Sequence, residues 1–269
     1  LLRFGNGGQV IDFIDEHLSS PRASDPFFIY VSFTAVHAPV DIDSPLAGSP
    51  SFPTDPRYAR LASEFGLTAA DYLNSSPIIG GQNQATIDKN RFDLAAMTLA
   101  LDENIGKVLD KLDAEGLGNN TLVVYTNDNG GAGYSQGFGG NFSYNKPLNG
   151  YKGASMTDGS IRVPAAARWS GTIPPGQIVI DPVISLDWGA TFVNADGSAP
   201  AQARNGLDGL DLMPRLKNGT PLPADRVLTW RASGLDSGGS AIRMGDWKMI
   251  DSMIVSTVCT GDHRSLARS

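Results

Sequence analysis

Four polar side chains in this sequence have the types and positions to act together on an anion. Asp128 and Asn129 directly follow TLVVYTN, a run rich in β-branched residues that predicts a buried strand. His37 comes just after a second strand-like run, FFIYVSF, and Lys152 lies in the segment YKG. Carboxylate and amide oxygens bind hard divalent cations, an imidazole moves protons near neutral pH, and an ammonium group neutralises an anion.

Each of these signals has a simpler structural interpretation when it is taken alone. The sequence Asp-Asn-Gly-Gly is favourable turn chemistry, and the Gly- and Asn-rich stretch from 132 to 151 is typical of a flexible loop. A single histidine near a core is usually a hydrogen-bonded structural residue, and a single lysine is usually a solvated surface charge. The elements that position these residues therefore decide whether they form a site.

A long helix between the two strands is expected to bring these residues to one edge of a sheet. Its apolar residues recur every three or four positions up to Gly116, and they are Leu94, Met97, Leu101, Ile105, Val108 and Leu112. Such a helix can cross over a sheet and join residues 27–33 to residues 121–126 as parallel strands. Because ligands gather at the carboxyl ends of parallel strands, we expect His37 to lie near Asp128 and Asn129, within reach of Lys152.

The flanking segments predict further helices and strands of an α/β fold. Apolar residues at helical spacing indicate a helix over 8–18, and two short helices are expected over 182–193 and 206–216. Residues 161–169 predict a strand near a sheet edge, because Pro164 interrupts the run.

The carboxyl-terminal part predicts a small antiparallel sheet beside the main one. The run VLTWRA is typical of a strand, and AIRMGDWKMI predicts two strands joined at Gly245-Asp246. We therefore divide the chain into an α/β domain over 1–222, the start of an antiparallel subdomain over 223–250, and a polar, unpatterned tail over 251–269.

Composition excludes several classes of protein. With 269 residues, of which 41% are hydrophobic, the chain can bury a substantial core. Its net charge of −7 and its lack of a Lys/Arg cluster argue against binding to nucleic acid. No apolar run is long enough to predict a membrane span, and the single cysteine, Cys259, excludes an internal disulfide.

Four stretches of this chain resemble the type I sulfatases, which belong to the alkaline-phosphatase-like superfamily. They are FFIYVSFTAVHAPV, LDENIGKVLDKLDAEGLGNNTLVVYTNDNGG, KPLNGYKGASMTDGSIRVPAAARWSGTIPPG and AIRMGDWKMI. In order and spacing they cover most of residues 1 to 250. The resemblance implies an alkaline-phosphatase-like fold: a mostly parallel sheet flanked by helices, with a small carboxyl-terminal antiparallel sheet.

The resemblance also implies a sulfuric ester hydrolase and a role for each of the four residues. Asp128 and Asn129 would be ligands of a Ca²⁺ ion, while His37 and Lys152 would contact the sulfate ester. The substrate would be a sulfated small molecule or, by analogy with the family, a sulfated carbohydrate. The chain itself leaves the location unknown; the resemblance implies a periplasmic or extracellular protein.

Two features of the family are missing from this sequence. Sulfatases make a formylglycine nucleophile within Cys/Ser-x-Pro-x-Arg, a pattern that occurs nowhere here; Cys259 is followed by Thr-Gly-Asp-His-Arg. The paired aspartates that complete the cation's shell are also missing, and two oxygen ligands fall short of the six to eight that Ca²⁺ prefers. We therefore expect the nucleophile upstream of Leu1, and the 269 residues alone to be inactive.

Two other interpretations stay open from the sequence. The chain could belong to a phosphoesterase or phosphonate hydrolase of the same superfamily, in which a different nucleophile would be found. It could also be a non-catalytic fragment that binds anionic glycans.

Overall fold

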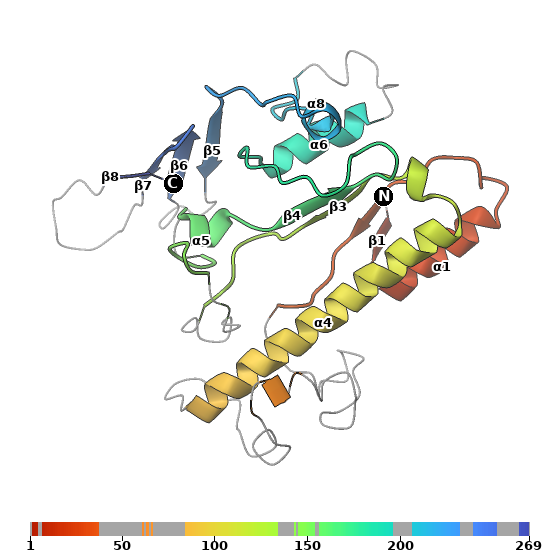
Figure 1. Cartoon of the computed structure of the whole chain (residues 1–269), viewed down its shortest axis with the longest axis horizontal. Coiled ribbons are helices and arrows are strands. Elements are labelled where there is room, and N and C mark those ends of the chain that lie inside the picture. The colour runs from red at the N-terminus through yellow and green to blue at the C-terminus, as the bar shows by residue number, and fades with distance from the viewer. Residues whose placement is uncertain are drawn as a thin grey trace. The chain divides into compact units, whose positions relative to one another are not determined.

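The computed structural model of the protein describes residues 2–4, 7–37, 61, 63–64, 66, 84–133, 143, 145–153, 156–195, 206–231, 239–251 and 264–268 (Figure 1). The chain divides into two compact units. The first holds residues 1–116, 131–147 and 151–153, and the second holds 117–130, 148–150 and 154–269.

The first unit contains two parallel strands joined by a helix. β1 (Leu2–Phe4) pairs in parallel with β2 (Ile29–Val31), and α1 (Gly7–Leu18) connects and contacts both strands. The helix predicted over 8–18 is confirmed. β1 was not predicted from the sequence, because three residues carry too little periodicity to indicate a strand.

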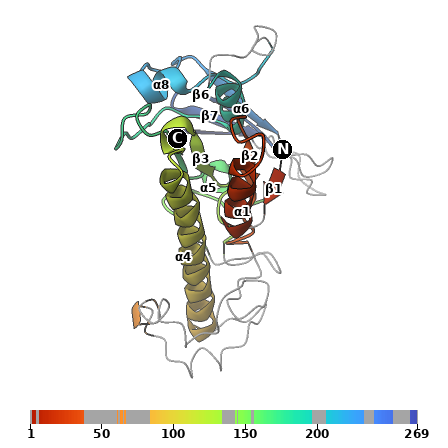
Figure 2. The same cartoon turned by 90° about the vertical axis from the view of Figure 1, so that its right-hand side faces the viewer.

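The longest helix in the described part of the chain is α4 (Gln84–Ala114), and α1 lies along it in both views (Figures 1 and 2). Val10 and Ile14 of α1 are each only 1% exposed. The two helices approach so closely that a Cβ on Gly7 would lie 2.8 Å from the backbone oxygen of Asn104. The predicted apolar stripe is confirmed as core only in part, because Leu101 and Leu112 are buried whereas its other four residues are half-buried. α4 begins ten residues before the stripe.

The strand expected over residues 27–33 is shorter and more exposed than predicted. Only Ile29–Val31 form β2, and the side chains of Phe28 and Tyr30 are 54% and 52% exposed. Alternate side chains of a strand point to opposite faces, so an aromatic run need not be buried on both. β2 also pairs with β1, whereas the sequence led us to expect the strand at 121–126 in the same sheet.

The second unit contains the strand that carries Asp128 and Asn129 at its end. This strand, β3 (Val123–Thr126), pairs with β4 (Ala165–Arg168). The pairing is antiparallel, and β3 has three half-buried residues and one exposed residue, so the expectation of a buried, parallel central strand is wrong for this pair. A β-branched run predicts a strand, but its partner is selected by contacts distant in sequence.

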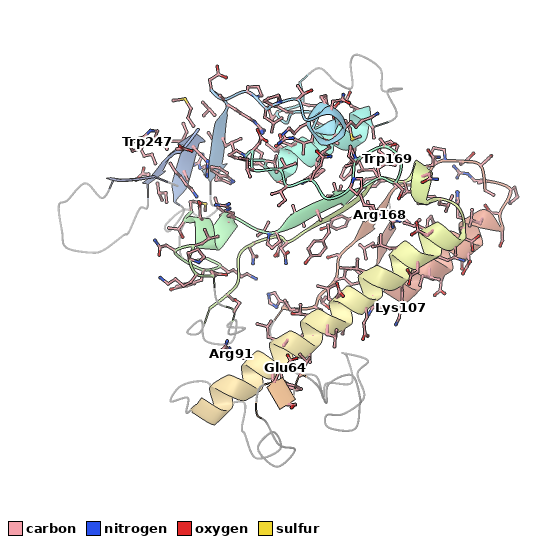
Figure 3. The ribbon with its side chains drawn as sticks, viewed as in Figure 1. Glu64, Arg91, Lys107, Arg168, Trp169 and Trp247 are labelled. Atoms are coloured by element: carbon pink, nitrogen blue, oxygen red, sulfur yellow. The ribbon has the colours of Figure 1, made fainter. Side chains whose placement is uncertain are left out.

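The strand predicted over 161–169 is shorter in the structure. β4 begins only at Ala165, just after Pro164, and the first predicted residue belongs to α5 (Asp158–Ile161), a single turn of helix. At the other end of β4 the indole nitrogen of Trp169 donates to the backbone oxygen of Asn119, at 3.0 Å (Figure 3). This bond ties β4 to η2 (Gly118–Asn120), the turn that leads into β3.

Two further helices were predicted in the second unit, one with nearly the observed bounds and one longer than observed. α6 (Ser185–Asn194) agrees with the helix expected over 182–193. The helix expected over 206–216 is limited to α8 (Met213–Asn218), which has a proline in its first turn and ends at Gly219 with φ 72°.

A buried carboxylate fixes the segment before α8 onto α6. Asp187 is fully buried and accepts hydrogen bonds from the backbone N–H groups of Ile184 and Leu210, both at 2.9 Å. Both of its oxygens also pair with the guanidinium of Arg226. Because every oxygen has a partner, this carboxylate can be buried without a large desolvation penalty.

The carboxyl-terminal sheet has four antiparallel strands in the order β5-β6-β7-β8. The predicted strands are confirmed as β5 (Val227–Arg231), β6 (Ser240–Met244) and β7 (Trp247–Asp251), with a turn at Gly245-Asp246. The tail expected to be unpatterned contributes β8 (Arg264–Arg268), which pairs with β7. Cys259 and His263 lie outside the described residues. No helix in the described part of the chain is long and apolar enough to span a membrane.

Removal of the Asp181 carboxylate is expected to destabilise the second unit in a pH-dependent way. Arg215 donates a 2.7 Å hydrogen bond to Asp181, and this bond holds the pKa of the carboxyl below its ordinary value of 3.8. A lowered pKa stabilises the fold above the unfolded-state pKa, and this stabilisation is lost as the pH falls through the folded-state pKa. Asp181→Asn should therefore lower the free energy of unfolding by about 1–2 kcal/mol at pH 7.

Urea unfolding at pH 7 and at about pH 3 measures this effect. The difference between wild type and variant should shrink at the lower pH. The exposed Asp225 offers a matched control, because Asp225→Asn removes a carboxylate that has no hydrogen bond to the described residues. An equal difference at both pH values would contradict the assignment.

Candidate active site

His37 and Lys152, which are far apart in the sequence, meet within the first unit. His37 lies in a turn after β2, where its backbone N–H donates to the oxygen of Thr34 at 2.8 Å. The Nζ atom of Lys152 lies 3.0 Å from Nε2 of His37. When the imidazole is neutral at Nε2, the ammonium is the donor of this bond. The predicted proximity of these two residues is confirmed.

The backbone of Lys152 is held by Gly131. The N–H of Lys152 donates to the oxygen of Gly131 at 3.0 Å. The side chain of Asn145 forms two hydrogen bonds with the backbone of Gly131. Its Oδ1 accepts from the N–H group at 3.1 Å, and its Nδ2 donates to the carbonyl oxygen at 2.9 Å. A Cβ on Gly131 would lie 2.0 Å from Oγ of Ser143, so only glycine fits.

Asn145 is a positioning residue that the sequence did not single out. Asn145 lies in the Gly- and Asn-rich stretch that was predicted to be a loop, and no motif around it distinguishes it from the other asparagines there. The only available signal was its proximity in sequence to Lys152. The structure shows that this part of the loop is held in place by hydrogen bonds rather than free.

Asp128 and Asn129 lie in the second unit, in the bend that follows β3. The exposed carboxylate of Asp128 has no hydrogen bond or ion pair with the described residues. The Nδ2 group of Asn129 donates to the oxygen of Gly130 at 2.9 Å, and its Oδ1 has no hydrogen bond to the described residues. A carboxylate next to an amide oxygen suits a hard cation such as Ca²⁺.

These two side chains account for only part of a cation site. Within the described residues, no group of three or more His, Cys, Asp and Glu side chains is placed to hold a metal ion. Asp128 and Asn129 would therefore contribute two ligands. The expectation that they share one site with His37 and Lys152 remains a prediction.

The bend at Asp128 and Asn129 is anchored by α5. The N–H of Gly130 donates to the oxygen of Ser160 at 2.8 Å. A Cβ on Gly130 would lie 1.9 Å from the oxygen of Gly159, so the close approach requires glycine at this position. On its other side, Gly159 donates to the oxygen of Asn149 at 2.7 Å. One turn of helix thus holds two loops of the second unit.

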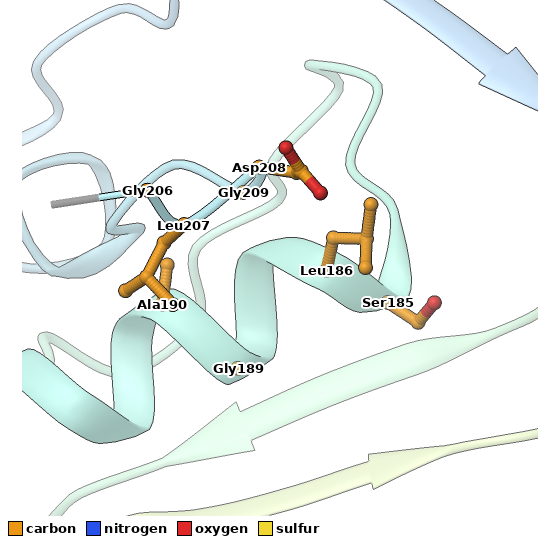
Figure 4. A pocket seen from close by; sticks show the side chains of 8 residues that line it. All are labelled: Ser185, Leu186, Gly189, Ala190, Gly206, Leu207, Asp208 and Gly209. Atoms are coloured by element: carbon orange, nitrogen blue, oxygen red, sulfur yellow. The ribbon is translucent and has the colours of Figure 1, made fainter. Parts of the chain in front are cut away.

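A separate hollow of about 310 Å³ lies elsewhere in the second unit, between α6 and the segment before α8 (Figure 4). Ser185, Leu186 and Ala190 line it on the helix side, and residues 206–209 line it on the other. None of the four predicted site residues contributes to it. It offers little charge beyond Asp208, so it does not suit an anionic ester.

A comparison with protein families decides what kind of protein carries these residues. The sequence model of the family described as Sulfatase matches residues 7–198, which is more than half of the chain. The chain belongs to the sulfatase family. The matched range contains His37, Asp128, Asn129 and Lys152.

Curated sulfatases are similar to this chain in sequence. Steryl-sulfatase from Rattus norvegicus is 40% identical over 119 residues, which are 43% of this chain and 20% of that protein. N-acetylgalactosamine-6-sulfatase from Canis lupus familiaris is 29% identical over 215 residues, which are 78% of this chain and 32% of that protein. The chain thus spans only about a fifth to a third of the length of these relatives.

Solved structures share the fold of this chain. Ps i-CgsB in complex with k-i-k-neocarrahexaose has a TM-score of 0.62 at 24% identity, over 91% of this chain and 44% of that one. BT4656 in complex with its substrate D-glucosamine-2-N,6-O-disulfate has a TM-score of 0.51 at 24% identity, over 78% and 39%. The phosphonate monoester hydrolase from Silicibacter pomeroyi has a TM-score of 0.56 at 20% identity, over 96% and 53%. The expected alkaline-phosphatase-like fold is thereby confirmed.

Proposed function

We propose that the protein that carries this chain hydrolyses sulfate monoesters, and that His37 and Lys152 bind and activate the ester. The observation that carries the proposal is the 3.0 Å contact between Nζ of Lys152 and Nε2 of His37. Two nitrogen donors at this separation can both reach one anionic group. Membership of the sulfatase family supports sulfate as that group.

The two side chains have different tasks in this proposal. The Lys152 ammonium donates to nonbridging sulfate oxygens and offsets the negative charge on them as the bond to sulfur breaks. The His37 imidazole, carrying a proton on Nε2, donates it to the departing alkoxide oxygen. In the state that protonates the leaving group, Nε2 of His37 carries the proton and no longer accepts from Lys152, so both nitrogens donate to the bound ester instead.

Asp128 and Asn129 would hold Ca²⁺ in this proposal. The Asp128 carboxylate and Oδ1 of Asn129 fit such an ion, since neither has a hydrogen bond to the part of the chain that the structure describes. When bound, the cation neutralises charge on the sulfate group. The hydrogen bond from Gly130 to Ser160 keeps the two ligands in place, because it holds the residue directly after Asn129.

A sulfated carbohydrate is our preferred substrate class, and a sulfated small molecule such as a steroid is the alternative. The names of the curated relatives include both a sugar sulfatase and a steryl-sulfatase. The likeness to BT4656 in complex with its substrate D-glucosamine-2-N,6-O-disulfate favours the sugar. The periplasmic or extracellular location remains a prediction that cell fractionation can test.

A calcium-dependent assay tests this function. The native protein should hydrolyse 4-methylumbelliferyl sulfate, lose activity with EGTA and recover it with added Ca²⁺. Asp128→Ala removes a charged ligand and should raise the half-saturating Ca²⁺ concentration at least about tenfold. Asp110→Ala, which removes an exposed carboxylate from α4, is the control and should leave that concentration unchanged.

Parallel assays with a phosphate monoester and a phosphonate monoester separate the related activities. A higher kcat/KM for either of these than for the sulfate would assign the protein to phosphoryl or phosphonyl chemistry. Absence of turnover with all three esters in the presence of Ca²⁺ would contradict an enzymatic function.

A further inference from the structure

Lys248 is a buried cation in the carboxyl-terminal sheet of the second unit. It lies on β7, and its side chain is only 4% exposed. Its Nζ donates to Oδ1 of Asp158 at 2.5 Å and lies 5.3 Å from the ring centre of Trp230. Burial of an ammonium group is costly unless it is paired, so this lysine is held by specific contacts.

The partner of Lys248 is the first residue of α5, the single turn that anchors the proposed calcium-binding bend. Gly130, which directly follows Asn129, donates to Ser160 of this turn at 2.8 Å. Gly159 donates to Asn149, so the turn also holds the segment 148–150. All of these contacts lie within the second unit.

The turn depends on contacts with the residues around it. α5 has four residues, and so short a helix is not stable without tertiary contacts. The hydroxyl of Thr157, the residue before the turn, caps no backbone N–H group but lies 3.1 Å from the hydroxyl of Ser160. The neighbouring Arg162 is 4.0 Å from Asp158 and 64% exposed, so it adds little.

We propose that Lys248 is a positioning residue for cation binding, which acts through Asp158 and α5 on the bend that carries Asp128 and Asn129. The inference rests on the proposed function, since it takes this bend to hold Ca²⁺. In this proposal the terminal sheet holds the cation ligands in position through α5. The sheet would thereby contribute to the site without touching substrate.

Calcium affinity is the decisive measurement, because it does not depend on turnover. Isothermal titration calorimetry and the Ca²⁺-dependent rise in melting temperature should be measured on the native protein and on three variants. Lys248→Met keeps the length of the side chain but removes the charge, and it should raise the Kd for Ca²⁺ about tenfold or more. Lys248→Arg keeps the charge and should retain most of the affinity.

Lys111→Met is the matched control. Lys111 also forms a 2.5 Å ion pair, with Asp15, but it joins α1 to α4 in the first unit. This variant should bind Ca²⁺ like the wild type. Asp158→Asn, which keeps the size of the side chain, decides the question if Lys248→Met does not fold, and it should also raise the Kd about tenfold.

The outcomes separate this inference from the proposed function. If folded Lys248→Met binds Ca²⁺ with the wild-type Kd, the proposed role of Lys248 is overturned but the calcium site is not. If Lys248→Met does not fold, a wild-type Kd in Asp158→Asn has the same consequence. A loss of affinity in Lys111→Met equal to that in Lys248→Met would also overturn it, since the effect would then be general destabilisation. A wild-type protein that binds no Ca²⁺ overturns the calcium site and, with it, this role.

Discussion

Replacement of His37 with glutamine should slow the hydrolysis of alkyl and sugar sulfates about 10²- to 10⁴-fold and should affect good leaving groups far less. An alkoxide is strongly basic, so its departure depends on a proton from the imidazole. The 4-nitrophenolate ion leaves without one. The 3.0 Å contact with Lys152 places the imidazole beside the group that would hold the sulfate.

The measurement is kcat/KM for a series of sulfate esters whose leaving groups differ in basicity. The ratio of wild type to His37→Gln should rise with the pKa of the leaving alcohol. An equal loss across the series would contradict the role of proton donor and would indicate that His37 serves only to position Lys152.

His17 provides the control for this experiment. It also lies after apolar residues, but its Nε2 is bonded to the backbone oxygen of Asp25 at 3.0 Å and its ring stacks on Phe13. His17→Gln should therefore reduce stability rather than change the dependence on the leaving group. Comparison of the two variants distinguishes a chemical histidine from a structural one.

Replacement of Lys152 with methionine should lower kcat/KM about 10²- to 10³-fold for every sulfate ester in the same series. Its ammonium is proposed to act on the nonbridging oxygens, which all substrates share. The loss should therefore be independent of the leaving group. Lys152→Arg should restore little activity, because the planar guanidinium differs in shape and reach from an ammonium.

Lys146→Met is the control for Lys152, because Lys146 is exposed in the same loop. It should leave kcat/KM within about twofold of wild type, as surface substitutions usually have small effects. A similar loss in both variants would indicate that the loop requires positive charge in general. The double variant of His37 and Lys152 should lose less than the product of the single losses, since the two residues are in contact.

The local elements of this fold were readable from the sequence because their signals are periodic. The apolar residues of α4 recur every three or four positions up to Gly116, whose φ of 70° is a conformation that favours glycine. The turn at Gly245-Asp246 identified β6 and β7 in the same way. Such patterns depend on neighbours along the chain and need no knowledge of the fold.

The pairing of strands distant in the sequence was not readable, and two expectations were wrong for this reason. β3 was expected to lie in a parallel sheet but pairs with β4 in antiparallel orientation. The tail was expected to be without pattern but supplies β8 to the terminal sheet. The hydrogen bonds of a strand come from its backbone, so its side chains say little about which partner it takes.

The sequence by itself predicted which residues would do the chemistry. His37, Lys152, Asp128 and Asn129 were identified from their types, their places after strand-like runs, and motifs that resemble the sulfatases. Only the tertiary structure decided that His37 and Lys152 meet at 3.0 Å, that Asn145 holds the backbone beside Lys152, and that Lys248 reaches Asp158. These contacts join residues distant in the chain, and no local periodicity encodes them, because they are set by how the elements pack.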